Sequence, residues 1–124
     1  MSFAVSDGVS QVLHAALNGL QTRQDVISNN IANVDTPNFT ASSVDFESAL
    51  QDAISSGKFQ DGSAAPSVAV SEQPTDTPVG PNGNNVDLRH EMVASMQTQY
   101  SYQIVARGIS DHYNLLKTAA VEAR

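Results

Sequence analysis

The sequence predicts an all-α fold in which long N- and C-terminal helices pair as an antiparallel coiled coil, with a short helix and a Pro/Gly-rich loop between them. Three observations lead to this prediction. Apolar residues recur at helical spacing over a long stretch at each end of the chain. Proline and glycine interrupt the centre too often for a helix to continue. Aromatic residues make up only 6% of the 124 residues and tryptophan is absent, which favours helices joined along a seam over a thick core.

The N-terminal segment, residues 6–34, is predicted to form one amphipathic helix. Its apolar positions follow a heptad pattern with one polar interruption. The pattern consists of Leu13, Leu17, Leu20, Gln24, Ile27, Ile31 and Val34. This spacing is typical of a coiled-coil seam, because the repeated positions all face the partner helix. Gly19 lies within the segment, and its missing side chain would let another backbone approach closely.

Residues 35–54 are predicted to contain a turn and a short helix. Pro37 cannot donate a backbone hydrogen bond, and it keeps the preceding residue out of the α region. Asn38 tolerates a positive φ angle and suits a turn. An apolar stripe then predicts a short helix that begins near Ser43 or Val44. The stripe consists of Phe46, Leu50 and Ile54.

Residues 55–85 are predicted to be a loop, because prolines and glycines alternate there with serine, threonine and asparagine. One stretch within the loop, residues 67–71 (SVAVS), has the alternation of a short strand. The loop is longer than a compact domain normally contains.

Residues 86–122 are predicted to form the second long helix, with Asn84 or Asn85 as its N-cap. Asp87 and Glu91 fall near the positive end of the helix dipole, where a solvated first turn is expected. An apolar stripe continues along the helix at spacings of three and four. It consists of Met92, Met96, Gln99 or Tyr100, Tyr102, Val105, Ile109, His112, Leu116 and Ala119.

Neither long helix can bury its stripe alone, so the first is expected to pack against the last within one domain spanning residues 1–124. Further seams would remain for neighbouring copies of the chain. The predicted seam residues are Leu13, Leu17, Leu20, Ile27, Ile31, Met92, Met96, Tyr102, Val105, Ile109 and Leu116. A subunit whose fold is completed by its neighbours is suited to build an oligomer.

The net charge of -7, from 13 acidic and 6 basic residues, argues against nucleic acid as a partner, because phosphate binding needs a cationic surface. No apolar run is long enough for membrane insertion. The first residues have neither a basic start nor an apolar core, so no cleavable signal peptide is expected. Cysteine is absent, which excludes disulfides and thiol chemistry.

No catalytic, cofactor-binding or metal site is predicted, and the chain is not expected to be an enzyme. The three histidines are His14, His90 and His112. His90 lies near Asp87 and Glu91, which superficially resembles a metal or acid–base cluster, but a solvated first turn of a helix is the preferred interpretation. No phosphate-binding loop, nucleophile elbow or zinc motif occurs.

Residues 29–33 (NNIAN) hold three asparagines, which is costly in a helix unless the amides are used. Two interpretations remain open. The cluster is a fraying helix end with an asparagine cap, or it makes hydrogen bonds that fix the helix end against a neighbouring molecule.

Residues 29–39 (NNIANVDTPNF) resemble the N-terminal signature of the flagellar rod and hook axial proteins, in which N-N-x-A-N precedes T-P-G-Y or a near variant. Residues 44–50 (VDFESAL) resemble the segment that follows in the smallest rod proteins. Residues 83–87, 91–93, 102–103 and 115–120 resemble the family's C-terminal region. Asn38 stands where the family usually has glycine, and Phe39 where it has tyrosine.

The resemblance implies a structural subunit of the flagellar basal-body rod, most similar to the proximal rod proteins. Such a subunit is exported by the flagellar type III apparatus, self-associates helically into a hollow drive shaft in the periplasm, and contacts other rod subunits, the MS ring and its rod adaptor protein. The assembly motif carried over from the family is Asn29, Asn30, Ile31, Ala32, Asn33, Thr36, Pro37 and Phe39. The alternative is a soluble coiled-coil binding module or an export chaperone of the flagellar system.

Overall fold

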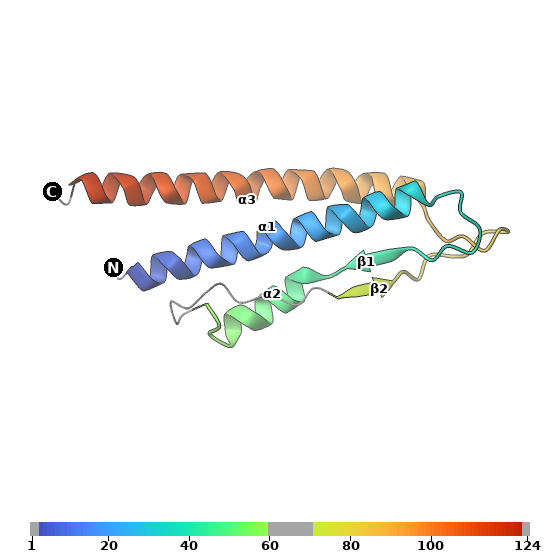
Figure 1. The fold of residues 1–124 in the computed structure, drawn as a ribbon, viewed down its shortest axis with the longest axis horizontal. Coiled ribbons are helices and arrows are strands. Elements are labelled where there is room, and N and C mark those ends of the chain that lie inside the picture. Colours follow the sequence, from blue (N-terminus) through green and yellow to red (C-terminus); the bar gives the residue numbers. More distant parts are fainter. Residues whose placement is uncertain (1–2, 60–70, 123–124) are drawn as a thin grey trace.

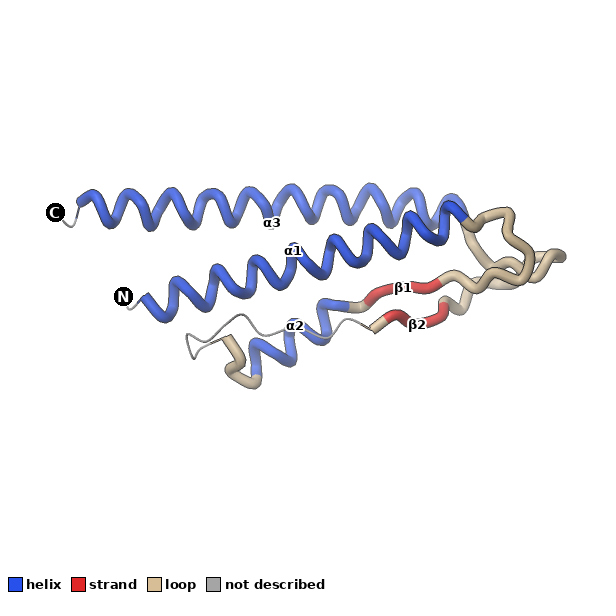
Figure 2. The backbone as a smooth tube through the Cα atoms, viewed as in Figure 1, coloured by secondary structure: helices blue, strands red, loops and turns tan. Residues whose placement is uncertain are grey.

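The computed structural model describes residues 3–59 and 71–122. Its elements are helix α1 (Phe3–Ala32), strand β1 (Ser42–Val44), helix α2 (Phe46–Ser55), strand β2 (Glu72–Pro74) and helix α3 (Leu88–Glu122). Figure 1 shows α1 in the middle, with α3 along one side and α2 and the strands along the other. Figure 2 shows that helix dominates and that loops gather where α1 ends and α3 begins. The prediction of a mainly helical fold is confirmed, with a small sheet added.

Helices α1 and α3 pack antiparallel, as the sequence predicts. Gln24 Nε2 donates to Ser95 Oγ at 3.0 Å, so the polar interruption in the predicted seam meets a polar partner. Toward the N-terminus of α1, His14 Nε2 lies 3.4 Å from the hydroxyl of Tyr113. Residues far apart in the sequence thus meet at two separate levels of the antiparallel pair.

Helix α1 has a second buried face, which the heptad pattern does not indicate. Phe46 of α2 lies against Gly19, where an added Cβ would stand 2.4 Å from Phe46 Cγ. Arg23 donates from Nη2 and Nε to the carbonyl of Val44, at 2.9 and 3.2 Å. It also pairs with Glu47, and its guanidinium carbon lies 4.7 Å from the centre of the Phe46 ring. These contacts hold the start of α2 against α1.

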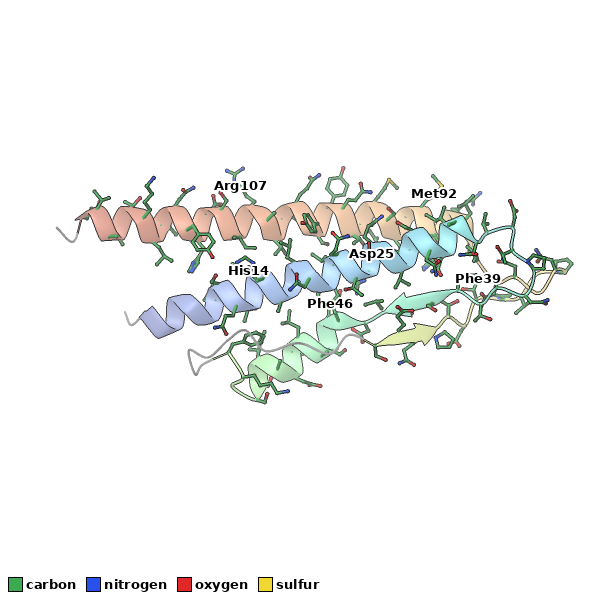
Figure 3. All side chains as sticks on the ribbon, in the orientation of Figure 1. His14, Asp25, Phe39, Phe46, Met92 and Arg107 are labelled. Atoms are coloured by element: carbon green, nitrogen blue, oxygen red, sulfur yellow. The ribbon has the colours of Figure 1, made fainter. Side chains whose placement is uncertain are left out.

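The main apolar cluster joins the elements on both sides of α1. Its buried members are Leu20, Val26, Val44 and Phe46, with Ala16, Leu50 and Val105 packed against them. Figure 3 shows Phe46 between α2 and α1. Because α1 contributes to two faces at once, it is the element around which the described part of the chain is organised.

The region after α1 differs from the prediction. Residues 42–44 are extended and pair antiparallel with residues 72–74, Ser42 opposite Pro74 and Val44 opposite Glu72. The predicted start of the short helix near Ser43 or Val44 is therefore wrong, and α2 begins at Phe46. The cause is that Asp45 caps α2 by accepting from the backbone N–H of Ser48. The strand predicted at residues 67–71 lies outside the described residues except for its last residue.

The start of α3 also differs from the prediction. Asp87, rather than Asn84 or Asn85, is the N-cap, because its Oδ1 accepts from the backbone N–H of His90 at 3.2 Å. The two asparagines are buried in the preceding loop. Glu91 was expected to be solvated, but only 5% of it is exposed. Glu91 is thus covered by the rest of the chain, whereas the first residues of α3, Leu88, Arg89 and His90, are exposed.

Met92 and Met96, two of the predicted seam residues, do not lie in the α1–α3 contact. Met92 and Met96 are both 55% exposed, whereas the residues beside them on the inner face, Glu91 and Thr98, are buried. Sequence spacing alone could not separate the two faces, because both carry apolar residues at helical intervals. Any role of Met92 and Met96 in contacts with other subunits stays a prediction. No helix in residues 3–59 or 71–122 is apolar over enough length to cross a membrane.

Two glycine-to-alanine substitutions are expected to change stability in opposite directions. Alanine favours a helix over glycine by about 1 kcal/mol. At Gly108 the new methyl would lie 3.8 Å from Leu13 Cδ2, an ordinary contact, so Gly108→Ala should stabilise the chain. At Gly19 it would overlap the inflexible part of Phe46, so Gly19→Ala should destabilise by about 1–3 kcal/mol. Urea unfolding measures both, and equal shifts in one direction would contradict the packing of Phe46 on Gly19.

The cap of α2 is expected to weaken in acid. Hydrogen bonds from the hydroxyl and backbone N–H of Ser48 lower the pKa of Asp45 from its ordinary value of 3.8. Because the folded-state pKa is the lower one, the stabilisation is present above 3.8 and disappears as pH falls through the lowered value. Asp45→Asn keeps an acceptor without a titrating charge, so its stability should fall less in acid than that of the wild type. Urea unfolding at neutral and acidic pH checks this, and parallel pH dependences would contradict it.

Candidate functional site

The candidate site is the region where α1 ends, the chain turns, and α3 begins. Asn30, in the last turns of α1, is the central residue and is 0% exposed. Its Nδ2 donates to the carbonyl of Ser42 at 2.7 Å, and its Oδ1 accepts from the backbone N–H of Ser42 at 3.1 Å. The amide therefore satisfies both backbone groups of one residue in β1. This two-point contact fixes the strand against the helix.

Asn33 and Thr36 organise the turn that follows α1. Asn33 Nδ2 donates to the carbonyl and to the side-chain oxygen of Asn29, at 2.8 and 3.1 Å. Thr36 Oγ1 donates to Asn33 Oδ1 at 3.1 Å. Side-chain amides and a hydroxyl therefore add to the backbone hydrogen bonds that close the end of α1.

Asn84 reaches back from the loop before α3 to the end of α1. Its Nδ2 donates to the carbonyls of Asn33 and Thr36, at 2.8 and 2.7 Å, and its Oδ1 accepts from the backbone N–H of Val86 at 2.8 Å. One buried amide thus satisfies carbonyls at the C-terminal end of α1 while it shapes the segment leading to α3.

Asn85 joins the same loop to the residues before β1. Its Oδ1 accepts from the backbone N–H of Ala41 at 2.6 Å, and its Nδ2 lies 3.4 Å from the carbonyl of Thr75. Asn85 N–H also donates to the carbonyl of Phe39 at 3.3 Å. We call the side chains of Asn30, Asn33, Asn84 and Asn85, with the backbone groups they bind, the polar joint.

Two residues with positive φ meet at the tip of the polar joint. Asn38 has φ 61°, so it adopts the left-handed conformation that the turn requires in the place of a glycine. Gly83 has φ 78°, and a Cβ there would stand 2.2 Å from Asn38 Oδ1. The backbone N–H of Asn38 donates to the carbonyl of Asn82 at 3.0 Å. Gly83 is therefore required both by its conformation and by the close approach of Asn38.

The structure gives the asparagine cluster a use that neither open interpretation named. Asn30 and Asn33 bond within their own chain, so the helix end is held in place without a neighbouring molecule. The other motif residues are more accessible: Ile31 and Phe39 are half-buried, and Asn29, Ala32, Thr36 and Pro37 are exposed. The exposed residues form a surface around the joint, and their predicted role in assembly is not tested by the fold.

The sequence analysis missed Asn84 and Asn85 as members of the site. Both were considered as caps of α3, and their partners lie far away in the chain. A signal existed, because a second asparagine-rich stretch follows the first across the loop. Arg23 was also missed as the residue that holds β1 and α2, since an arginine on a helix is usually solvated.

Helix α3 carries a second set of apolar residues on the face opposite α1. We call this set the outer stripe, and it consists of Met92, Val93, Met96, Tyr100, Ile104 and Leu115. Ile104, Tyr100 and Leu115 are 71%, 69% and 70% exposed. Figure 3 shows Arg107 on this outward side as well. A row of exposed apolar side chains along one helix face is typical of a protein–protein contact.

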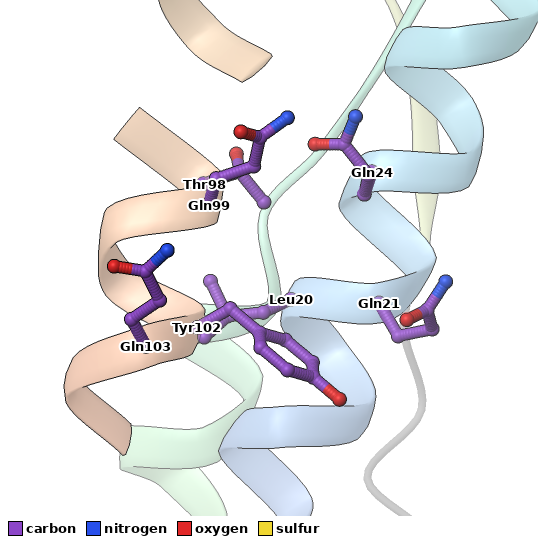
Figure 4. A pocket seen from close by; sticks show the side chains of 7 residues that line it. All are labelled: Leu20, Gln21, Gln24, Thr98, Gln99, Tyr102 and Gln103. Carbon is purple, nitrogen blue, oxygen red and sulfur yellow. The ribbon is translucent and has the colours of Figure 1, made fainter. Parts of the chain in front are cut away.

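A groove runs between α1 and α3 (Figure 4). Its lining residues are Leu20, Gln21, Gln24, Thr98, Gln99, Tyr102 and Gln103. The lining consists mainly of amides and hydroxyls and contains no carboxylate, imidazole or thiol. Within the described residues, no cluster of three or more His, Asp or Glu side chains is placed to hold a metal ion.

Comparison with known proteins places the chain among flagellar components. A family model described as flagella basal body rod protein matches residues 11–40, which include the end of α1 and the turn of the polar joint. The flagellar basal body rod protein FlgB of Bacillus subtilis is 37% identical over 121 residues, covering 90% of this chain and 92% of that protein.

Other relatives of the same description extend over most of the chain. FlgB of Borreliella burgdorferi is 35% identical and covers 81% of this chain and 85% of its own length. FlgB of Salmonella typhimurium is 31% identical, with 79% of this chain and 82% of that protein covered. The similarity therefore extends well beyond the signature to both long helices and the segment between them.

Proposed function

Because this chain belongs to the FlgB family of flagellar basal body rod proteins, we propose that it occupies the proximal part of the rod and packs there with its neighbours through the two long helices. The chain is a structural subunit of the flagellar basal body rod and associates with other basal body components. The alternative of a soluble binding module or export chaperone is not favoured, because the relatives are rod proteins and the similarity covers most of their length.

The outer stripe of α3 is the observation that best supports packing between subunits. Within the chain α3 contacts α1 on one face only, and the opposite face exposes Tyr100, Ile104 and other apolar residues. Burial of apolar surface of this kind against another molecule is favourable, because it removes the surface from water. The subunits would then form the wall of a hollow shaft, with α3 buried on two sides after assembly.

The polar joint supports the mechanical part of the proposal. A drive shaft has to transmit torque without its subunits bending at the connection between their helices. Asn84 bonds the loop before α3 to the end of α1, and Asn85 bonds the same loop to Ala41 before β1, both through buried amides. Buried hydrogen bonds specify one geometry, because breaking any of them leaves an unpaired polar group. The joint would therefore keep the two helices in a fixed relation.

The finer assignments are also part of the proposal. The partners would be other rod subunits, the MS ring and its rod adaptor protein, and the location would be the periplasmic rod, reached through the flagellar type III apparatus. We infer that the subunit has no catalytic activity. The similarity to flagellar basal body rod proteins supports that inference.

Deletion of the gene tests the proposed place in the rod. In the organism that encodes the chain, electron cryotomography of the deletion strain should show MS rings without rods, hooks or filaments. Complementation with the wild-type gene should restore complete flagella. Complete flagella in the deletion strain, with no second copy of the gene, would refute the proposal.

A charge in the outer stripe is expected to block assembly without unfolding the subunit. Ile104→Asp replaces a 71% exposed residue, so the purified variant should keep wild-type helix content and stability. In the deletion strain it should fail to restore rods, because assembly would bury an unpaired carboxylate. Ser110→Asp is the matched control, since it adds the same charge at an exposed polar position of α3. Normal motility with Ile104→Asp would show that the outer stripe is not an interface.

A further inference from the structure

The chain contains two asparagines that are followed by glycine, Asn18 in α1 and Asn82 at the tip of the polar joint. Such pairs are the asparagines most prone to lose their side-chain amide, because glycine has no side chain to block its own backbone nitrogen from reaching the asparagine Cγ. We propose that Asn82 is a spontaneous modification site in the folded chain and that the fold protects Asn18.

The reaction needs only the chain and water. The backbone nitrogen of Gly83 loses its proton and attacks Cγ of Asn82, forming a C–N bond. The bond from Cγ to Nδ2 breaks, and Nδ2 leaves as ammonia after taking up a proton. Water then opens the five-membered imide at either carbonyl. The product is an aspartate or an isoaspartate, and no oxidant or reductant takes part.

The surroundings of Asn82 favour this attack. The residue is exposed, so hydroxide and buffer bases reach the Gly83 nitrogen. The backbone N–H of Asn84 donates to Asn82 Oδ1 at 3.2 Å. A donor at this oxygen polarises the amide and stabilises the negative charge that develops on it during attack. The one interaction that holds the Gly83 N–H is a turn bond to the carbonyl of Gly80, at 3.0 Å.

The surroundings of Asn18 oppose the same attack. The residue lies in the middle of α1, where the N–H of the next residue belongs to the helical ladder. The carbonyl of Asn18 also accepts from Thr22 Oγ1 at 3.0 Å. Gly19 is buried under Phe46. To reach Cγ, the Gly19 nitrogen would have to leave the helix and displace α2.

Modification at Asn82 would alter the polar joint. The carbonyl of Asn82 accepts from the backbone N–H of Asn38, and this bond ties the signature turn to the loop before α3. An isoaspartate leads the backbone through Cβ and Cγ, which adds a methylene to the chain and turns the former carbonyl of residue 82 into a free carboxylate. Either product makes the chain more negative than -7. The joint would therefore loosen slowly with the age of the molecule.

Peptide mass mapping of the full-length folded protein, incubated at mildly alkaline pH, tests the proposal. Circular dichroism at each time point confirms that the fold persists. Aspartate and isoaspartate together should accumulate at residue 82 at least about tenfold faster than at residue 18, which corresponds to a difference of about 1.4 kcal/mol in activation free energy. In urea the two pairs should react at similar rates, because both are then unstructured peptides.

Equal rates at the two positions in the folded protein would overturn the proposal. So would the absence of reaction at both positions in the folded protein when both react in urea, because the turn bond of Gly83 would then protect Asn82. Asn82→Ser should abolish isoaspartate formation in the joint. Asn82→Asp carries the charge without the added methylene, so it should be more stable than the isoaspartate form, and equal stabilities would refute the loosening of the joint.

Discussion

Leu20→Asp should unfold most of the isolated chain. Leu20 is 3% exposed and belongs to the cluster that joins α1 with β1, α2 and α3. Removal of a buried leucine costs about 2–5 kcal/mol, and a carboxylate without a partner adds to this cost. Small proteins are stable by only about 5–15 kcal/mol, so the variant should lose most of its cooperative transition. Thermal unfolding followed by circular dichroism measures the loss.

Leu115→Asp is the matched control for this experiment. It makes the same chemical change in the other long helix, at a residue that is 70% exposed. The free energy of unfolding of the control should lie within about 0.5 kcal/mol of that of the wild type, because surface substitutions usually have effects of this size. If Leu20→Asp melted like the control, the position of Leu20 in the centre of the fold would be wrong.

Asn30→Asp should make the stability of the chain strongly dependent on pH. The two side chains have nearly the same shape, but an ionised carboxylate cannot donate to the Ser42 carbonyl, which lies 2.7 Å from Asn30 Nδ2. In neutral solution the variant should therefore lose at least about 3 kcal/mol, because a charge is buried against an oxygen acceptor. Once protonated, the new carboxyl group can again donate to Ser42 and accept from it.

The sign of the pH effect follows from burial. Desolvation and the facing carbonyl raise the pKa of the introduced carboxyl group in the folded state above its unfolded value. The Asn30→Asp variant should therefore be about as stable as the wild type below the unfolded-state pKa of the new carboxyl group. Its stability should be lost as pH rises through the folded-state pKa of that group. Urea unfolding of both proteins at acidic and neutral pH gives this difference directly, with the wild type correcting for other titrating groups.

Asn29→Asp serves as the neighbouring control. Asn29 is exposed, and its side-chain oxygen accepts from Asn33 Nδ2, which a carboxylate does equally well. Only a small cost is expected, from a negative charge near the C-terminal end of α1. A loss at Asn29 as large as that at Asn30 would mean that charge at the helix end, and not the buried amide, sets the stability.

Local periodicity predicted much of this fold. The heptad pattern identified α1 and its packing against α3, and Leu20 and Ile27 of that pattern are buried. Pro37 and the asparagines around it indicated that the helix ends nearby, and α1 ends at Ala32. These features depend on residues close together in the sequence, so the sequence pattern contains the information needed to find them.

The details that failed depend on long-range partners. The extended conformation of residues 42–44 is stabilised by pairing with residues 72–74 and by Arg23, none of which the local sequence reveals. The two apolar faces of α3 look alike in the sequence, and only the position of α1 decides that Met96 points outward. In both cases contacts with distant residues, and not the local sequence, decide the structure.

By itself the sequence determined the two long helices, the break between them, the acidic surface and the resemblance to rod proteins, because periodicity, proline chemistry, charge and a short motif are all local properties. The tertiary structure alone decided how the asparagines are used. Asn84 bonds to carbonyls at Asn33 and Thr36, and Asn30 bonds to Ser42. An amide can donate to or accept from almost any backbone group, so its partner is set by the path of the chain through space.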